Sequence, residues 1–327
     1  MPTIPAAPVP PRTVPTATLV VFRLAALFTF LAVGLGAVVC ATGSGASCPT
    51  WPGCRPGAIA PAWELSPLIE FTHRVVAMSA GPLVLAAALL SIRVPGALRR
   101  VRALPWLALA GALAAGAFGR IAVVGHLSTT LGGVDLFSAL TSMASMATAT
   151  VALGAARRAS ADAVSEPADL PRALAPLAGA AVATVVAMHV TGIFAAGTGS
   201  YTRCLGWPLW RTVRGDLHPA LQAVRLGLAA MAAALVVAVV VVAVRRARTR
   251  RGGLVLAALF GAEMLLGLVI RGGGLDRGVA ASYSALAAGL LWCLALLGAV
   301  AWSARTAQRP APDGGPALHD GRELALT

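Results

Sequence analysis

The sequence predicts an all-α polytopic membrane protein of eight transmembrane helices, built as two repeated four-helix bundles with both termini in the cytoplasm. Three observations predict this fold class: the composition, a series of long apolar runs, and a loop pattern that occurs twice. Hydrophobic residues make up 58% and charged residues 12% of the 327 residues, and the mean hydropathy is +0.81. A soluble domain carries about twice that share of charge. The composition therefore favours a chain whose surface largely faces lipid.

Eight apolar runs are long enough to cross a hydrocarbon core, which takes about 20 residues. They cover residues 19–41, 67–92, 104–125, 135–156, 173–196, 218–244, 253–270 and 279–302. The first run is too long for the apolar core of a signal peptide. We expect residues 1–18 to be a disordered Pro-rich leader and residues 303–327 to be a polar cytoplasmic tail. The two halves of the domain organisation are then 19–156 and 173–302.

The arginines predict the orientation and exclude nucleic acid as a partner. The net charge of +14 comes from arginine, since the chain contains no lysine. These arginines cluster in short segments between apolar runs, which is the pattern of membrane topology. The basic segments are 93–102, 157–172 and 245–251. By the positive-inside rule, the poorer loops at 42–66, 126–134, 197–217 and 271–278 face outward.

An internal repeat is visible in two of the outward loops. The pattern Thr-Gly-Ser, then Cys, then Trp-Pro occupies residues 42–52 and recurs at identical spacing in residues 198–208. A shorter Ser-Ala-Leu match pairs residues 138–140 with 284–286. Duplication is a common way to build membrane bundles with sites at the repeat interface.

Three ionisable residues lie together in the second apolar run. Glu70 and His73 are three residues apart, so they share one face of a helix, and Arg74 follows. A charged residue at mid-membrane costs about 2.5–3.5 kcal/mol on insertion scales, so such residues are functional candidates. The face offers a nitrogen ligand and a carboxylate, and Arg74 could pair with a carboxylate. The alternative is a snorkelling cluster near the outer interface.

The other histidines carry weaker signals. His218 stands in the second half where His73 stands in the first, directly after Asp216-Leu217, and Arg225 follows two turns later. This repeat relation favours His218 as a ligand over a helix-capping role. His126 and His189 have no partner in the repeat.

The cysteines divide into an outward pair and three single residues. Cys48 and Cys54 are six residues apart in an outward loop, where a disulfide can form. They are too few for a structural zinc site, which takes four ligands. Cys204 has no second cysteine near it in the sequence. Cys40 and Cys293 lie within apolar runs and are expected to be small buried residues.

The loop motif and the second-run motif together resemble the haem A synthase family. The residues that carry the resemblance are Thr42-Gly43-Ser44-Gly45, Cys48-Pro49, Trp51-Pro52, Cys54 and Glu70-x-x-His73-Arg74. The two-by-four helix architecture is similar too, so the resemblance covers nearly the whole membrane portion. It implies oxidation of a methyl substituent of haem O to the formyl group of haem A, for use by terminal oxidases.

The resemblance also implies a haem-sized site in each half. In the N-terminal half, His73 would be an axial ligand of the substrate haem, Glu70 a catalytic or proton-handling carboxylate, and Arg74 a further cofactor-binding residue. In the C-terminal half, His218 would ligate a haem b that passes electrons. Cys48 and Cys54 would form the disulfide at the outer face. A protein tunes a haem through its axial ligands, hydrogen bonds and burial.

The chain departs from the family pattern at the second ligand of each site. The expected histidines of the fourth and eighth runs fall on Ser138 and Ser284, and neither run contains a histidine. Three interpretations stay open: five-coordinate haems, a substitute ligand, or a divergent relative that binds haem without making haem A. The candidate substitutes are Met143, Met146, His126 and His189.

The sequence thus predicts a haem A synthase-like oxidoreductase of a bacterial cytoplasmic membrane. A non-catalytic haem-binding or haem-handling membrane protein is the alternative. A transporter with inverted repeats is disfavoured, because four spans per half place both halves in the same orientation. The expected partners are the lipid bilayer and a haem O synthase that supplies substrate. A homo-oligomer stays open.

Overall fold

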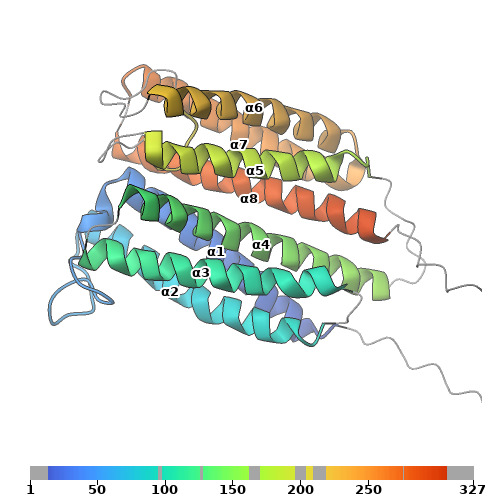
Figure 1. The fold of residues 1–327 in the computed structure, drawn as a ribbon, viewed down its shortest axis with the longest axis horizontal. Helices are drawn as coiled ribbons and strands as arrows, with labels where there is room; N and C mark the ends of the chain where they lie inside the picture. Colours follow the sequence, from blue (N-terminus) through green and yellow to red (C-terminus); the bar gives the residue numbers. More distant parts are fainter. Residues whose placement is uncertain are drawn as a thin grey trace, which may run out of the picture.

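The computed structural model describes residues 14–94, 98–125, 128–161, 170–195, 204–208, 219–274 and 276–307. Within these residues the chain forms eight α-helices and one short 3-10 helix (Figure 1). All eight α-helices are long and apolar enough to cross a membrane. Helices suit this setting because they satisfy their own backbone hydrogen bonds where lipid offers none. The chain is a polytopic membrane protein, as the apolar runs predicted.

The helices follow one another along the chain, with the longer connections between α1 and α2 and between α5 and α6. Their bounds are α1 Thr16–Ala41, η1 Ser44–Ala46, α2 Leu65–Ser91, α3 Arg99–Val124, α4 Thr129–Ala161, α5 Leu174–Ala195, α6 Pro219–Val244, α7 Ala247–Arg271 and α8 Arg277–Ala307.

Several helices extend beyond the apolar runs, which corrects the expected boundaries. α1 begins at Thr16, inside the expected leader, and α8 continues to Ala307, inside the expected tail. α4 continues through Arg157 and Arg158, beyond the expected end of the fourth apolar run at residue 156. The apolar run ends where charge begins, but a helix can continue into the headgroup layer, where arginine is well solvated.

Each half of the chain is a ring of four helices, and the two rings lie side by side (Figure 1). α1, α2, α3 and α4 pack in sequence and close through α1 against α4. α5, α6, α7 and α8 pack in the same order and close through α5 against α8. The halves meet where α8 packs on α1 and α4, and where α4 packs on α5. An evolutionary duplication stays a prediction.

The interface between the halves contains aromatic and small side chains. The rings of Phe30 in α1 and Trp292 in α8 lie 5.0 Å apart between centroids.

Within the N-terminal half, α3 and α4 approach closely at Gly111, where an added Cβ would lie 2.6 Å from the Ser138 carbonyl oxygen. Ser142 Oγ donates a 2.8 Å hydrogen bond to the Ala108 carbonyl across the same contact. Small residues allow such backbone approach in membrane bundles.

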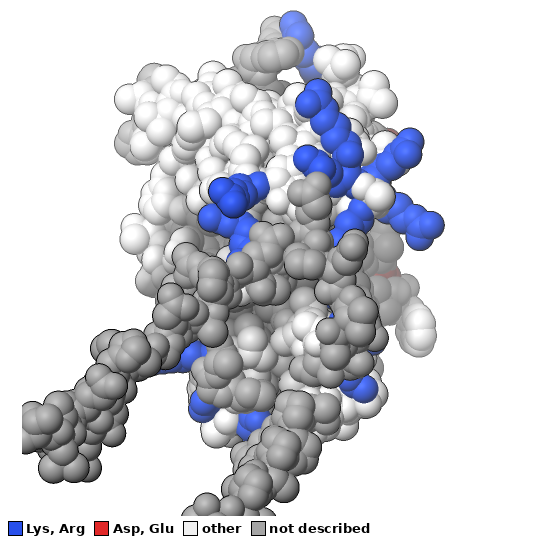
Figure 2. Space-filling view, turned by 90° about the vertical axis from the view of Figure 1, so that its right-hand side faces the viewer, with Lys and Arg blue, Asp and Glu red and all other residues white. Residues whose placement is uncertain are grey.

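Arginines gather at the end of the bundle where α1 begins and α8 ends, which we call the arginine end. Figure 2 faces this end and shows the basic side chains spread across it. The described arginines nearest the helix termini there are Arg23, Arg93, Arg99, Arg102, Arg157, Arg158, Arg172, Arg245, Arg246, Arg248, Arg250, Arg251 and Arg305. The opposite end, with the loop of residues 42–64, is called the outward end. Which side of the membrane each end occupies stays a prediction.

We predict that the arginine end lies in the cytoplasm, because basic residues flanking a span are retained there. Reporter fusions after Arg158 and Arg250 should show cytoplasmic activity, and fusions at Trp51 and Trp207 should show the outward side. A reporter that places Arg158 and Trp51 on the same side would contradict the topology.

Gly111→Ala should destabilise the N-terminal half by about 1–3 kcal/mol, the usual cost of overpacking. The added methyl group would meet the α4 backbone, which cannot move as a side chain can. Thermal unfolding in detergent would measure the loss. Gly116→Ala is the matched control, since it lies in the same helix with nothing within 4 Å of its added Cβ. Equal midpoints for the two variants would show that the close contact is absent.

Candidate functional site

Arg74 joins the outward end of α2 to the loop that precedes it. Its Nε donates to Glu70 Oε1 at 2.8 Å, one helical turn earlier. Its Nη1 donates to the carbonyls of Thr50 and Gly53, and its Nη2 donates to the Cys48 carbonyl at 2.7 Å. The guanidinium group therefore donates to acceptors on two sides. Arginine suits this arrangement better than lysine, because its planar fork presents several N–H donors in fixed directions.

The Glu70–Arg74 pair is buried, with 5% and 6% of the two residues exposed. This burial argues against the snorkelling alternative, in which the charged ends would reach water. The expected pairing of Arg74 with a carboxylate is confirmed, and its partner is Glu70. Breaking such a buried pair from one side would leave an uncompensated charge.

Cys48 and Cys54 form a disulfide within this loop, with Cα atoms 4.2 Å apart. Both cysteines are fully buried. On the outer side of the loop, the Arg120 guanidinium in α3 lies 5.5 Å from the centre of the Trp51 ring. The disulfide, the Arg74 fork and this cation–π contact together fix the loop over the outward end of the N-terminal half.

His73 lies on the same face of α2 and turns its ring toward α1. Its Cε1 would lie 3.0 Å from a Cβ added at Gly36, so only glycine leaves full room for the ring there. Its Nδ1 is buried and has no hydrogen-bond partner among the described residues. In the tautomer that carries its proton on Nε2, the lone pair of Nδ1 is therefore available to a ligand.

The candidate substitute ligands in α4 are Met143 and Met146. α2 and α4 occupy opposite corners of the four-helix bundle. Met143 and Met146 are fully buried and pack into two different apolar clusters of the core. Among the described residues, no hydrogen bond joins Nδ1 of His73 to Ser138.

In the C-terminal half, Ser284 already has a partner. Its Oγ donates a 2.6 Å hydrogen bond to the Leu205 carbonyl, and the neighbouring Tyr283 hydroxyl donates to the Trp207 carbonyl at 2.7 Å. Trp207 is buried against the ring of Phe260 in α7, with centroids 5.2 Å apart. α8 therefore binds the segment 204–208 at the place where the family pattern has a histidine.

His189 in α5 contacts the same segment from the other side. It is buried, and its Nδ1 accepts a 3.5 Å hydrogen bond from the Gly206 amide. A neutral imidazole that accepts at Nδ1 carries its proton on Nε2. That nitrogen is buried without a described partner, but in this tautomer it is a donor and not a metal ligand.

Sequence reasoning missed Glu263 in α7. It is fully buried, and neither carboxylate oxygen has a hydrogen-bond partner among the described residues. The indole nitrogen of Trp207 and the amide nitrogen of Gln222 are likewise buried without a described partner. The signal was available, because Glu263 is an acidic residue in the middle of an apolar run and such residues are costly.

Two of the sequence expectations for single cysteines are wrong. Cys40 and Cys204 form a disulfide that spans 164 residues, with Cα atoms 5.6 Å apart. Cys40 is thus not a buried single residue, and Cys204 has a partner in the other half. Spacing within one loop could not reveal the pair, because packing of α1 beside the C-terminal half brings the two cysteines together. Cys293 is free and buried, as expected.

The remaining histidine candidates, His126 and His218, lie outside the described residues, as does Asp216. The first Thr-Gly-Ser block lies at the end of α1 and in η1, where Thr42 and Ser44 share a 2.7 Å hydrogen bond. The second block, residues 198–200, also lies outside the described part of the chain.

Comparison with known proteins gives two relatives of the same kind. The chain is 30% identical over 251 residues to a protein of Symbiobacterium thermophilum named "Heme A synthase", covering 72% of this chain and 80% of the relative. It is 30% identical over 222 residues to a "Heme A synthase" of Bacillus licheniformis, covering 67% of this chain and 72% of that relative. No family model matches the chain.

We predict that digestion of the unreduced protein yields the Cys204 peptide linked to the peptide that carries Cys40, and a loop closed by Cys48 and Cys54 within one peptide. Mass spectrometry would identify them, and Cys293 should label with a thiol reagent only after unfolding, because it is buried. Cys204→Ser should lower the thermal midpoint more than Cys293→Ser, the matched control. Linkage of Cys204 to Cys48 or Cys54 would contradict the pairing.

Proposed function

Because the chain belongs to the haem A synthase family, we propose that it oxidises the methyl substituent of haem O to the formyl group of haem A. The observation that carries the proposal is His73, whose Nδ1 is buried without a partner among the described residues and lies one helical turn from Glu70. The substrate is apolar and large, and a site among apolar helices suits it. The proposed location is a bacterial cytoplasmic membrane, with a haem O synthase as supplier.

His73 is the proposed axial ligand of the substrate haem. A ligating histidine usually donates its other ring N–H to a carbonyl or carboxylate, which fixes the tautomer and the ring orientation. Among the described residues, the contact of the His73 ring is with α1, where Gly36 leaves room for the imidazole and an added Cβ would lie 3.0 Å from Cε1. The donor set in this half therefore fits a haem iron on one face.

Glu70 is the proposed proton acceptor. With water as the oxygen source, turning the methyl group into a formyl group releases protons from the substrate carbon and from water, together with an equal number of electrons that an external electron acceptor in the membrane would take. A carboxylate beside the substrate can take them. Arg74 holds Oε1 of Glu70 and leaves Oε2 outside the ion pair. We infer that Arg74 positions the carboxylate, and that the loop carbonyls in turn position Arg74.

The described residues of the C-terminal half do not form an equivalent haem site. Ser284 donates to Leu205, and His189 presents a protonated Nε2 in its described tautomer. The proposed haem b therefore depends on His218, which lies outside the described residues.

Glu70→Gln should retain haem and lower the rate of haem A formation by about 10²–10⁴-fold, the usual contribution of general acid–base catalysis. Glutamine keeps the size of the side chain and its acceptor oxygen for Arg74 but cannot take a proton. His73→Ala should lose haem from the N-terminal half along with activity. The measurements are haem extraction with chromatographic separation of haems O and A, and the absorption spectrum.

Gly36→Ala tests the position of His73 without removing it. The added methyl group would press on the imidazole, so the haem spectrum should shift and activity should fall. Gly34→Ala is the matched control in the same helix, with nothing within 4 Å of its added Cβ.

Two outcomes would contradict the assigned roles. If Glu70→Gln forms haem A at the normal rate, Glu70 is not catalytic. If His73→Ala retains haem unchanged, His73 is not the ligand.

A further inference from the structure

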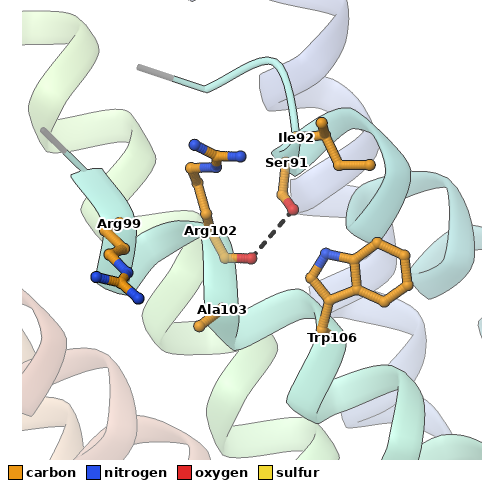
Figure 3. A pocket seen from close by; sticks show the side chains of 6 residues that line it. All are labelled: Ser91, Ile92, Arg99, Arg102, Ala103 and Trp106. Carbon is orange, nitrogen blue, oxygen red and sulfur yellow. Dashed lines mark hydrogen bonds between the residues drawn. The ribbon is translucent and has the colours of Figure 1, made fainter. Parts of the chain in front are cut away.

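The arginine end of the N-terminal half contains a cavity of about 440 Å³ between the last turn of α2 and the first turns of α3. Figure 3 shows its lining. The residues are Ser91, Ile92, Arg99, Arg102, Ala103 and Trp106. Two guanidinium groups and an indole therefore surround one hollow at the level where a helix leaves the membrane.

The cavity has a fixed floor. Ser91 Oγ donates to the Ala88 carbonyl at 2.7 Å and to the Arg102 carbonyl at 3.1 Å, so it joins the end of α2 to the start of α3 (Figure 3). Ser91 itself is fully buried. The backbone that carries Arg99 and Arg102 is thus held in place by a contact between α2 and α3.

The charges of this cavity have no described counter-ion. Among the residues that the structure describes, no ion pair involves Arg99 or Arg102. The apolar side of the hollow is open to lipid, since Ile92 is 54% and Trp106 43% exposed. The lining therefore has two parts. Two guanidinium cations can bind an anion, and an apolar wall continues onto the surface that faces the bilayer.

A second cavity of about 350 Å³ repeats this combination between α1 and α4, at the same end. Arg23, Arg157 and Arg158 supply its charges, and Leu19 and Val20 supply its apolar wall. Arg157 Nη2 donates a 2.7 Å hydrogen bond to Thr16 Oγ1, which ties the start of α1 to the end of α4.

We propose that these two cavities bind the phosphate headgroups of anionic membrane lipids, with the acyl chains lying along the apolar wall. Arginine forks match phosphate oxygens in bidentate geometry. Basic pockets between helices on the cytoplasmic side are suited to anionic headgroups. A free phosphate ion shares the charge chemistry but gains nothing from Ile92, Trp106, Leu19 or Val20, so the lipid is the occupant that uses the whole lining.

The test uses the purified full-length protein in detergent micelles that contain phosphatidylcholine. Phosphatidylglycerol is titrated in, and bound lipid is counted by native mass spectrometry. Near a membrane surface each arginine contributes about five-fold in anionic-lipid affinity. We therefore expect Arg99→Gln with Arg102→Gln to weaken one class of bound lipid by about 25-fold, and Arg157→Gln with Arg158→Gln to weaken another.

The matched control is Arg250→Gln with Arg251→Gln, which removes the same charge from exposed positions at the same end that line neither cavity. It should keep both classes of bound lipid. Equal loss in all three double variants would mean general charge attraction and would overturn the proposal. Inorganic phosphate that displaces the lipid at micromolar concentration would also overturn it. The readout is independent of haem, so the proposed oxidation can fail or hold separately.

Discussion

A single buried guanidinium holds the outward end of the N-terminal half together. A charge in that position must be neutralised and hydrogen-bonded, or its burial costs several kcal/mol. Arg74 meets this requirement with Glu70 on its own helix and with carbonyls of the 48–54 loop. Because the same helical turn carries His73, the loop, the carboxylate and the imidazole are held in one fixed relation. The site therefore depends on the ion pair more than on any apolar contact.

The described residues of the two halves differ near the expected ligand positions. In the C-terminal half Ser284 holds the Leu205 carbonyl, while Tyr283 and His189 contact the next two residues of the same segment. The segment is also joined to α1 through Cys40 and Cys204. In the N-terminal half, Nδ1 of His73 has no hydrogen-bond partner among the described residues. Ser284 thus makes a structural contact, whereas His73 keeps one ring nitrogen without a described partner.

Much of the fold could be predicted because lipid imposes simple rules on length and charge. The eight spans followed from apolar runs, and the shared face of Glu70 and His73 followed from helical spacing. That Arg74 could pair with a carboxylate was visible in the sequence, but its partner Glu70 was not. The Cys40–Cys204 disulfide could not be predicted, because it depends on how α1 packs beside the other half. The helix ends were misplaced since hydropathy marks the lipid boundary and not the last hydrogen-bonded turn. Glu263 was overlooked although its charge within an apolar run was visible.

The arginines at the two ends of the bundle differ in how their charge is compensated. At the outward end, Arg74 is enclosed and its donors are satisfied inside the protein by a carboxylate and by carbonyls. At the arginine end, Arg99 and Arg102 face an open hollow, and the described residues give them no ion pair. Internal compensation fixes a geometry, which a reaction site needs. Uncompensated charge instead attracts anions from outside, which orients the chain and binds it to the lipid surface. In the proposed functions, the same residue type thus positions a reaction site at one end and binds lipid at the other.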